Sequence, residues 1–169
     1  MAKTIHASVN LALRGEFANS ADLGTSKLPL AYNGNFVFTN GTGANQVGSV
    51  FTDTRTLAAS GSEDLDLSGV LTDAFGAAIV FTKIKGLIIK AAAANTNDVL
   101  VGGHASAACA SFFGDATDKV RVKPGGMVAL MAPNAAGYAV AAGTADLLTV
   151  ANSGSGAGVT FDILILGTV

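Results

Sequence analysis

The first segment of the chain alternates between apolar residues and residues that are mostly small or polar. Its apolar positions are Ile5, Ala7, Val9, Leu11 and Leu13. Because successive side chains of a β-strand point to opposite faces, this period of two predicts an extended strand with one apolar face. The same period, rather than the 3.6-residue period of an amphipathic helix, dominates the rest of the chain.

Further strands are predicted wherever β-branched or aromatic residues recur between turn signals. These segments are residues 28–30, 36–39, 47–57, 65–67, 79–90, 99–101, 119–123, 127–131, 145–150 and 159–166. The segment 79–90 carries the strongest signal, and Gly86 within it indicates a bulge or a close backbone approach. Residues 69–76 predict one turn of helix. We therefore expect an all-β fold, a single antiparallel β-sandwich or jelly-roll-like domain of about eight to ten short strands.

A stretch rich in Gly, Asn and Ser follows the first strand, over residues 14–27, and predicts a linker. This divides the chain into an N-terminal strand or arm with its linker, residues 1–25, and a sandwich domain, residues 26–169. Two interpretations of the first strand stay open. It is either an assembly arm that adds to a neighbouring subunit's sheet through Ile5, Val9, Leu11 and Leu13, or the first strand of the protein's own sandwich.

The composition indicates an unusual surface. Only 13% of the 169 residues are charged, and the net charge is −2. This balance gives no basic footprint for nucleic acid, and a single cysteine excludes a disulfide framework. The most apolar segment, residues 77–94, contains three lysines, so we expect no membrane partner. A chain with so few charges is expected to bury much of its surface against other proteins, first of all as a homo-oligomer.

Candidate catalytic and metal-binding groups are few. Cys109 lies close to His104 in sequence but is flanked by alanines, as is typical of an inert buried thiol. Residues 64–75 imitate the oxygen spacing of a calcium-binding EF-hand loop, with Gly69 at its sixth position, but Phe75 stands where the loop needs a bidentate glutamate. The favoured interpretation is a strand that leaves into a turn with solvated carboxylates. We expect no catalytic residue, no cofactor and no metal site.

Three lysines form a second candidate group. Lys83 and Lys85 are expected on one face of a strand, with Lys90 further along it. Two tyrosines and no tryptophan make a thin stacking platform for single-stranded nucleic acid. The lysines therefore indicate a solvated face or a contact with an acidic protein.

Four segments of the sequence carry a resemblance to a known family: residues 51–67, 71–76, 81–87 and 123–126. The first reads FTDTRTLAASGSEDLDL and the last KPGG. Together they resemble small virion structural proteins of tailed bacteriophages, and among these the head decoration (cement) proteins. The resemblance covers residues 47–169. Such proteins have no catalytic residues, so none is transferred to this sequence.

The resemblance implies a β-rich protein, commonly a homotrimer, on the outer surface of a viral capsid. There it would bridge neighbouring major capsid proteins, and during assembly it would be in the host cytoplasm. A tail or tail-fibre component is one alternative, and a carbohydrate-binding β-sandwich module is another. The carbohydrate alternative is disfavoured because sugar platforms use exposed aromatic side chains, and only 7% of the residues here are aromatic. An enzyme is the least favoured class.

Overall fold

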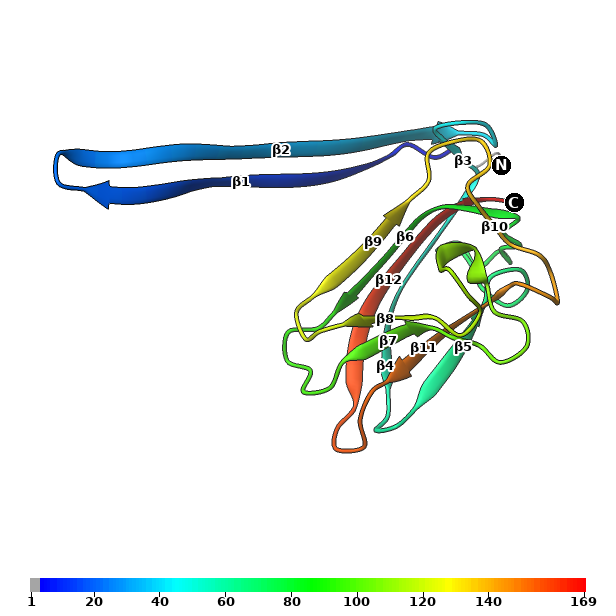
Figure 1. The fold of residues 1–169 in the computed structure, drawn as a ribbon. Helices are drawn as coiled ribbons and strands as arrows, with labels where there is room; N and C mark the ends of the chain where they lie inside the picture. The colour runs from blue at the N-terminus through cyan, green and yellow to red at the C-terminus, as the bar shows by residue number, and fades with distance from the viewer. Residues whose placement is uncertain (1–3) are drawn as a thin grey trace.

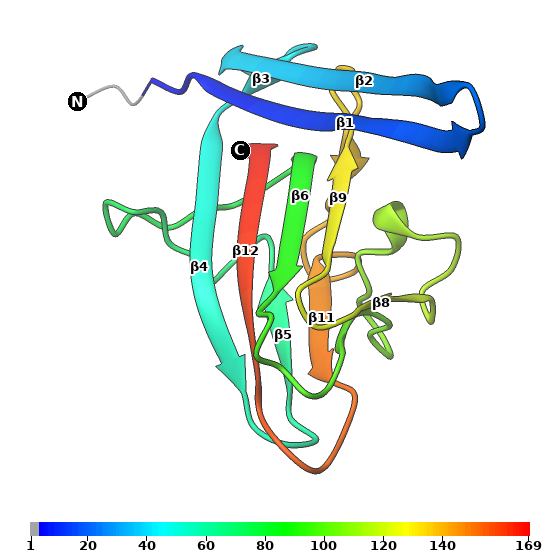
Figure 2. The same cartoon turned by 90° about the vertical axis from the view of Figure 1, so that its left-hand side faces the viewer.

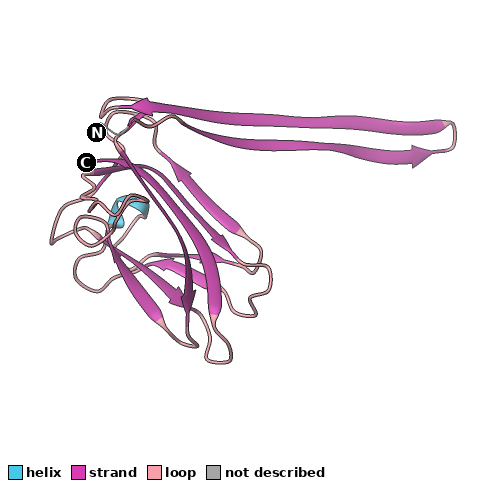
Figure 3. Cartoon of the chain, turned by 180° about the vertical axis from the view of Figure 1, so that it is seen from behind, coloured by secondary structure: helices cyan, strands magenta, loops and turns pink. Residues whose placement is uncertain are grey.

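The computed structural model describes residues 4–169, and this part of the chain is almost entirely β-structure (Figure 3). Its helical content is one short 3-10 turn, η1 (Ala110–Phe112). The strands, in chain order, are β1 (Ala7–Ala21), β2 (Gly24–Asn40), β3 (Gln46–Val47), β4 (Ser49–Leu57), β5 (Ser62–Asp66), β6 (Lys83–Ala91), β7 (Val99–Gly102), β8 (Lys119–Val122), β9 (Met127–Met131), β10 (Tyr138–Ala139), β11 (Leu147–Asn152) and β12 (Val159–Thr168).

Two antiparallel sheets pack face to face as a β-sandwich. The five-stranded sheet has the order β10–β6–β12–β4. β9 pairs with the same edge of β6 as β10 does, but further along that strand. The four-stranded sheet has the order β5–β11–β7–β8. Figure 2 looks onto the outer face of the five-stranded sheet, with β5 and β11 behind it. The prediction of an all-β antiparallel sandwich is confirmed.

The central strand β12 shows why these residues form a sandwich. Phe161, Ile163 and Ile165 are fully buried in the core between the sheets, whereas Leu164 between them is exposed on the outer face. One apolar face of each strand is thus buried against the other sheet. The alternation of apolar and polar residues in the sequence indicates which face is buried.

The expectation for Gly86 is confirmed. Leu166 of β12 lies opposite Gly86, but the next residue, Gly167, lies opposite Ile84, so that Lys85 is the extra residue of a bulge. A Cβ atom at Gly86 would lie 3.0 Å from the Met131 methyl carbon, so Gly86 is a place of close approach and a larger residue would require Met131 to shift.

Three local expectations are wrong. Residues 14–27 are not a linker, because β1 runs through to Ala21 and β2 begins at Gly24. Residues 28–30 and 36–39 are not separate strands but parts of β2. Residues 69–76 form turns and a bridge rather than a helical turn, since the Asp73 carboxylate accepts the backbone N–H groups of Phe75 and Ala77.

The first two strands form a long hairpin that projects from one end of the sandwich (Figure 1). Its strands have 15 and 17 residues, joined by the two-residue turn Asp22–Leu23. β1 pairs with β2 and belongs to neither sheet of the sandwich. The hairpin also crosses the expected boundary at residue 25, because residues 26–40 form its second strand instead of opening the sandwich.

Candidate assembly surface

One face of the hairpin is apolar along almost its whole length. Cross-strand partners on this face are Val9 with Phe36, Leu13 with Tyr32 and Phe17 with Leu28. Leu11 and Leu30 lie on the same face, opposite Gly34 and Gly15. Directly opposed apolar side chains on one face are the unit that stabilises a strand pair, so this row of contacts holds the two strands in register.

The other face of the hairpin is polar and carries its charges. Arg14 and Glu16 lie on it, and Glu16 forms an ion pair with Lys27 across the strands, with 2.9 Å between Oε1 and Nζ. The remaining residues of this face, Val37 and Pro29 apart, are small or polar: Ser8, Asn10, Ala12, Ala18, Ser20, Thr25, Ala31, Asn33 and Asn35. The hairpin is therefore an amphipathic ribbon with one uncharged face.

The base of the apolar face packs onto the sandwich. Phe38 is 0% exposed and forms a buried cluster with Val47 and Leu166. Partly buried apolar residues surround this cluster, namely Ile5, Ala7, Val9, Phe36, Val50 and Met131. The parallel pairing of β3 with the end of β2 adds backbone hydrogen bonds at the same place. These contacts fix the direction in which the hairpin leaves the body.

The outer part of the same face projects beyond the sandwich (Figure 1). We call it the distal apolar face and define it by Leu11, Leu13, Phe17, Leu28, Leu30 and Tyr32. Phe17 is 69% exposed, Leu28 58% and Leu13 57%. In residues 4–169, eight of the fourteen exposed large hydrophobic side chains lie between Leu11 and Val37. An exposed apolar patch of this extent marks a surface that another molecule covers.

The four predicted arm residues divide between the two parts of the hairpin face. Ile5 and Val9 lie at its base against the body, and Leu11 and Leu13 lie on the distal apolar face. Sequence reasoning missed Phe17 and the residues contributed by β2. A signal was present, because Leu28, Leu30, Tyr32, Gly34, Phe36 and Phe38 continue the same period of two.

A groove of about 300 Å³ lies where the hairpin meets the outer face of the five-stranded sheet. Ile5 and Val9 form one wall, and Val50, Ile88 and Leu164 form the other. Ile88 and Leu164 are direct cross-strand neighbours, and Leu164 is 39% exposed. The apolar surface of the hairpin thus continues onto this sheet.

His104 and Cys109 are not brought together as a nucleophile and base. The Cys109 thiol is buried, with Sγ 3.4 Å from the Ser111 hydroxyl and 3.7 Å from the Ala139 carbonyl oxygen. Burial raises the pKa of this thiol. His104 instead accepts backbone N–H groups of Ser106 and Ala107 at Nδ1, and its Nε2 lies 3.6 Å from an Asp64 oxygen.

The acidic stretch 64–75 does not close into a calcium loop. Asp64 accepts the Thr149 hydroxyl at 2.6 Å, and Asp66 accepts the backbone N–H of Ser68 at 2.9 Å. β5 ends at Asp66 and leads into a turn, as the favoured interpretation predicts. Within residues 4–169, no three His, Cys, Asp or Glu side chains are grouped to hold a metal ion.

The lysines do not form one solvated face. Lys85, the bulge residue, is 0% exposed and donates from Nζ to the Asn134 carbonyl oxygen. Its burial, together with the nearby charge of Lys83, lowers the pKa of Lys85. Lys83 donates to the Ala135 carbonyl oxygen, while Lys90 is exposed on the outer face of the sheet. Lys85 therefore holds the loop before β10 against β6.

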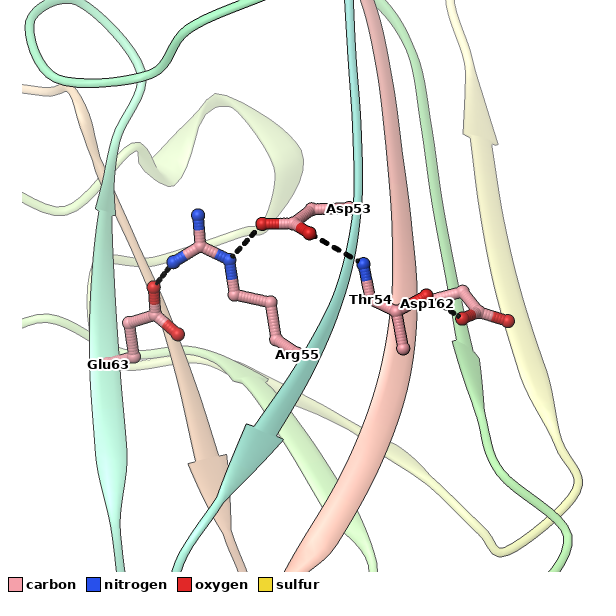
Figure 4. A network of polar contacts seen from close by, with 5 residues as sticks. All are labelled: Asp53, Thr54, Arg55, Glu63 and Asp162. Carbon is pink, nitrogen blue, oxygen red and sulfur yellow. Dashed lines mark hydrogen bonds and ion pairs between the residues drawn. The ribbon is translucent and has the colours of Figure 1, made fainter. Parts of the chain in front are cut away.

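An arginine joins the edges of the two sheets (Figure 4). Arg55 of β4 donates to the Glu63 carboxylate on β5 and, from Nε, to Asp53 at 2.8 Å. Asp53 also accepts the backbone N–H of Thr54, whose hydroxyl donates to Asp162 on the neighbouring strand β12. The guanidinium group lies 5.7 Å from the centre of the Phe51 ring. This network explains five charged or polar side chains in this region as structural contacts.

Two buried aspartates, Asp98 and Asp146, accept hydrogen bonds from other segments of the sandwich. Asp98 accepts Arg121 Nη1 at 2.7 Å and Lys123 Nζ at 2.9 Å, and these hydrogen bonds hold its pKa below the usual value. Burial alone would raise the pKa of Asp146, but hydrogen bonds from the Gly143 N–H and the Ser68 hydroxyl outweigh it and lower this pKa.

Acid is expected to destabilise the fold through these carboxylates. A folded-state pKa below the unfolded value gives stability that is fully present above the unfolded pKa and is lost as pH falls through the folded pKa. The free energy of unfolding, measured with urea at fixed salt, should therefore fall as the pH is lowered from 5 to 2.5 (roughly the range over which such carboxylates are protonated). Asp98→Asn should flatten this dependence. A free energy of unfolding that stays constant over the range would contradict the assignment.

Comparison with protein-family models, with curated protein sequences and with solved structures finds no match to this chain. Nothing helical in residues 4–169 has the length and apolar character that crossing a bilayer requires.

Proposed function

We propose that this protein is a non-enzymatic structural protein of a virion, a capsid decoration protein that binds the assembled lattice of major capsid proteins and stabilises the head. The observation that carries the proposal is the distal apolar face, held outside a closed sandwich by the Phe38 cluster. A ribbon with an uncharged face, whose strand edges are unpaired beyond the short contact with β3, is suited to bind protein rather than a small substrate.

Binding of this kind stabilises a shell by thermodynamic linkage. A protein that binds neighbouring subunits of an assembled lattice, but not the separated subunits, shifts the equilibrium toward the assembled state. The low charge of the chain fits this role, because large permanent interfaces are more apolar than transient ones. The outer surface of the capsid is the proposed location, and the host cytoplasm is the place of assembly.

A shortened hairpin tests the proposal. Removal of residues 11–20 and 25–34 joins Asn10 to Ala21 and Gly24 to Asn35, which keeps the native turn, the register and the Phe38 cluster. This variant should fold, give an unchanged far-ultraviolet signature of the sandwich and lose at least about 90% of its co-sedimentation with heads. Such a loss corresponds to about 1.4 kcal/mol or more of binding free energy.

Cryo-electron microscopy of virions of the phage that encodes the chain locates the protein directly. Density for the sandwich on the outer capsid shell supports the proposal. Density on the tail would overturn the capsid location in favour of a tail component, and absence from the virion would overturn the structural role altogether. A shortened hairpin that still binds heads at full affinity would show that the hairpin is not the binding element.

A further inference from the structure

Exposure of the distal apolar face to water is unfavourable, so we expect another protein surface to cover it. A two-stranded hairpin alone is marginally stable, and long exposed edges next to apolar side chains invite pairing with other chains. β1 and β2 pair over fifteen residues, but only the base of the apolar face rests on the body. The structure thus holds a strand pair whose outer half lacks a third layer in the single chain.

The charges of the hairpin restrict what that cover is. Arg14, Glu16 and Lys27 lie on the opposite face and Asp22 lies in the turn, so the distal apolar face itself offers no charged group to a partner. A partner surface rich in charge would be desolvated there without compensation. The cover must therefore present an uncharged, largely apolar and accessible surface.

This chain carries one such surface itself. The outer face of the five-stranded sheet beside the groove has the cross-strand row Ala129, Ile88, Leu164 and Thr52, which is uncharged. Ala129, Leu164 and Thr52 are exposed and Ile88 is partly exposed. We call this row with Val50 the receiving face. The charged pair Lys90 and Asp162 begins only one row further from the hairpin.

Contact area favours exchange between copies. From Leu11 to Ala21 the hairpin is roughly 35 Å long and about 10 Å wide, so its apolar face offers about 350 Å². A stable interface needs about 800 Å² on each partner. One hairpin on an unrelated protein falls far short of that area, whereas in a symmetric assembly every copy both gives a hairpin and receives one, which doubles the area per copy to roughly 700 Å² and brings it close to that requirement.

We propose that the hairpin of one copy docks its distal apolar face onto the receiving face of another copy, so that copies of this chain exchange arms. This inference rests on the proposed function: the distal apolar faces hold the copies of an oligomer together, and the oligomer binds the shell through its other surfaces. In Figure 1 the hairpin overhangs the side of the body on which the five-stranded sheet lies.

The oligomeric state of the purified full chain tests the exchange. We expect analytical ultracentrifugation at micromolar concentrations to show an oligomer for the natural sequence. Phe17→Asp on the distal apolar face should raise the dissociation constant by at least about 30-fold. Ala18→Asp is the matched control, because the next residue of the same strand lies on the polar face opposite Lys27 and should leave the dissociation constant unchanged.

The receiving face is tested in the same way. Leu164→Asp should weaken association as strongly as Phe17→Asp, whereas Thr56→Asp, at the other end of the same outer face, should not. Unchanged thermal unfolding of dissociated Leu164→Asp would show that the variant is folded. A natural sequence that stays monomeric at about 100 μM, weak by the standard of specific interfaces, would overturn the exchange. So would full association of Leu164→Asp.

Cross-linking identifies the two faces directly. Because the natural Cys109 is buried, introduced cysteines are the accessible thiols. A Phe17→Cys copy mixed with a differently tagged Leu164→Cys copy should give a mixed dimer with a short bis-maleimide, and Ala18→Cys in place of Phe17→Cys should not. Equal cross-linking by both would overturn the assignment. These experiments contain no capsid, so they test the exchange separately from the capsid function. A monomeric protein that still binds heads would refute the exchange alone. An oligomer that does not bind heads would refute the capsid function alone.

Discussion

Replacement of Phe38 by alanine is expected to lower the free energy of unfolding by about 3–5 kcal/mol. Phe38 is 0% exposed and lies in the cluster where the hairpin meets Val47 and Leu166 of the body. The change removes the buried ring and leaves a cavity at the only apolar anchor of the hairpin within the described residues. Urea unfolding measures the loss, and amide hydrogen exchange should show β1 and β2 opening faster than β12.

Val37→Ala is the matched control for this prediction. Val37 is the preceding residue of β2, lies on the opposite face and is 54% exposed. Its truncation should change the free energy of unfolding by less than about 0.5 kcal/mol, as is usual at the surface. Equal losses for the two variants would mean that the cluster does not anchor the hairpin.

Replacement of Phe161 by alanine is expected to cost a similar amount, about 3–5 kcal/mol, but to act on the sandwich instead of the hairpin. Phe161 is 0% exposed on the central strand β12 and is part of the large core between the sheets. Thermal and urea unfolding should both shift, and hydrogen exchange should become faster in both sheets. Comparison of Phe38→Ala with Phe161→Ala thus distinguishes the stability of the hairpin from that of the sandwich.

Leu164→Ala provides the comparison on the same strand. Its side chain points to the outer face and is 39% exposed, so the truncation removes less buried surface and leaves no enclosed cavity. We expect a loss of about 1 kcal/mol or less in the dissociated protein. A loss as large as that of Phe161→Ala would contradict the assignment of inner and outer faces.

The period of two in the sequence was sufficient to predict the sandwich. Met127 to Met131 is a strand within the predicted limits, and β12 extends its predicted segment 159–166 by two residues. Such segments are predictable because one face is buried in the core, which forces the alternation.

The hairpin was predictable only in part. Gly15, Asn19 and Ser20 are weak strand formers, and together they predicted a linker. They lie in β1 because each has a partner in β2, and long-range pairing overrides local preference. The expected strand at residues 5–13 was therefore right in kind, but its partner, its length and its exposure come from pairing that a local pattern does not contain.

The position of Lys85 could not be predicted from the sequence. Lys85 sits in an alternating segment that predicted an exposed lysine, but the bulge beside Gly86 turns it into the interior, where a backbone carbonyl group receives its ammonium group. A bulge shifts every later side chain of its strand by one position relative to the partner strand, so the face of a single lysine is not readable from spacing alone.

The anchor of the hairpin joins residues that are synthesised far apart in time. Phe38 is synthesised before every strand of the sandwich, whereas Leu166, its partner in the cluster, belongs to the last of these strands. β1 and β2 need only each other to pair, but the apolar cluster at the base of the hairpin is complete only when β12 has been made. The hairpin is therefore fully anchored only once the last strand of the sandwich is in place.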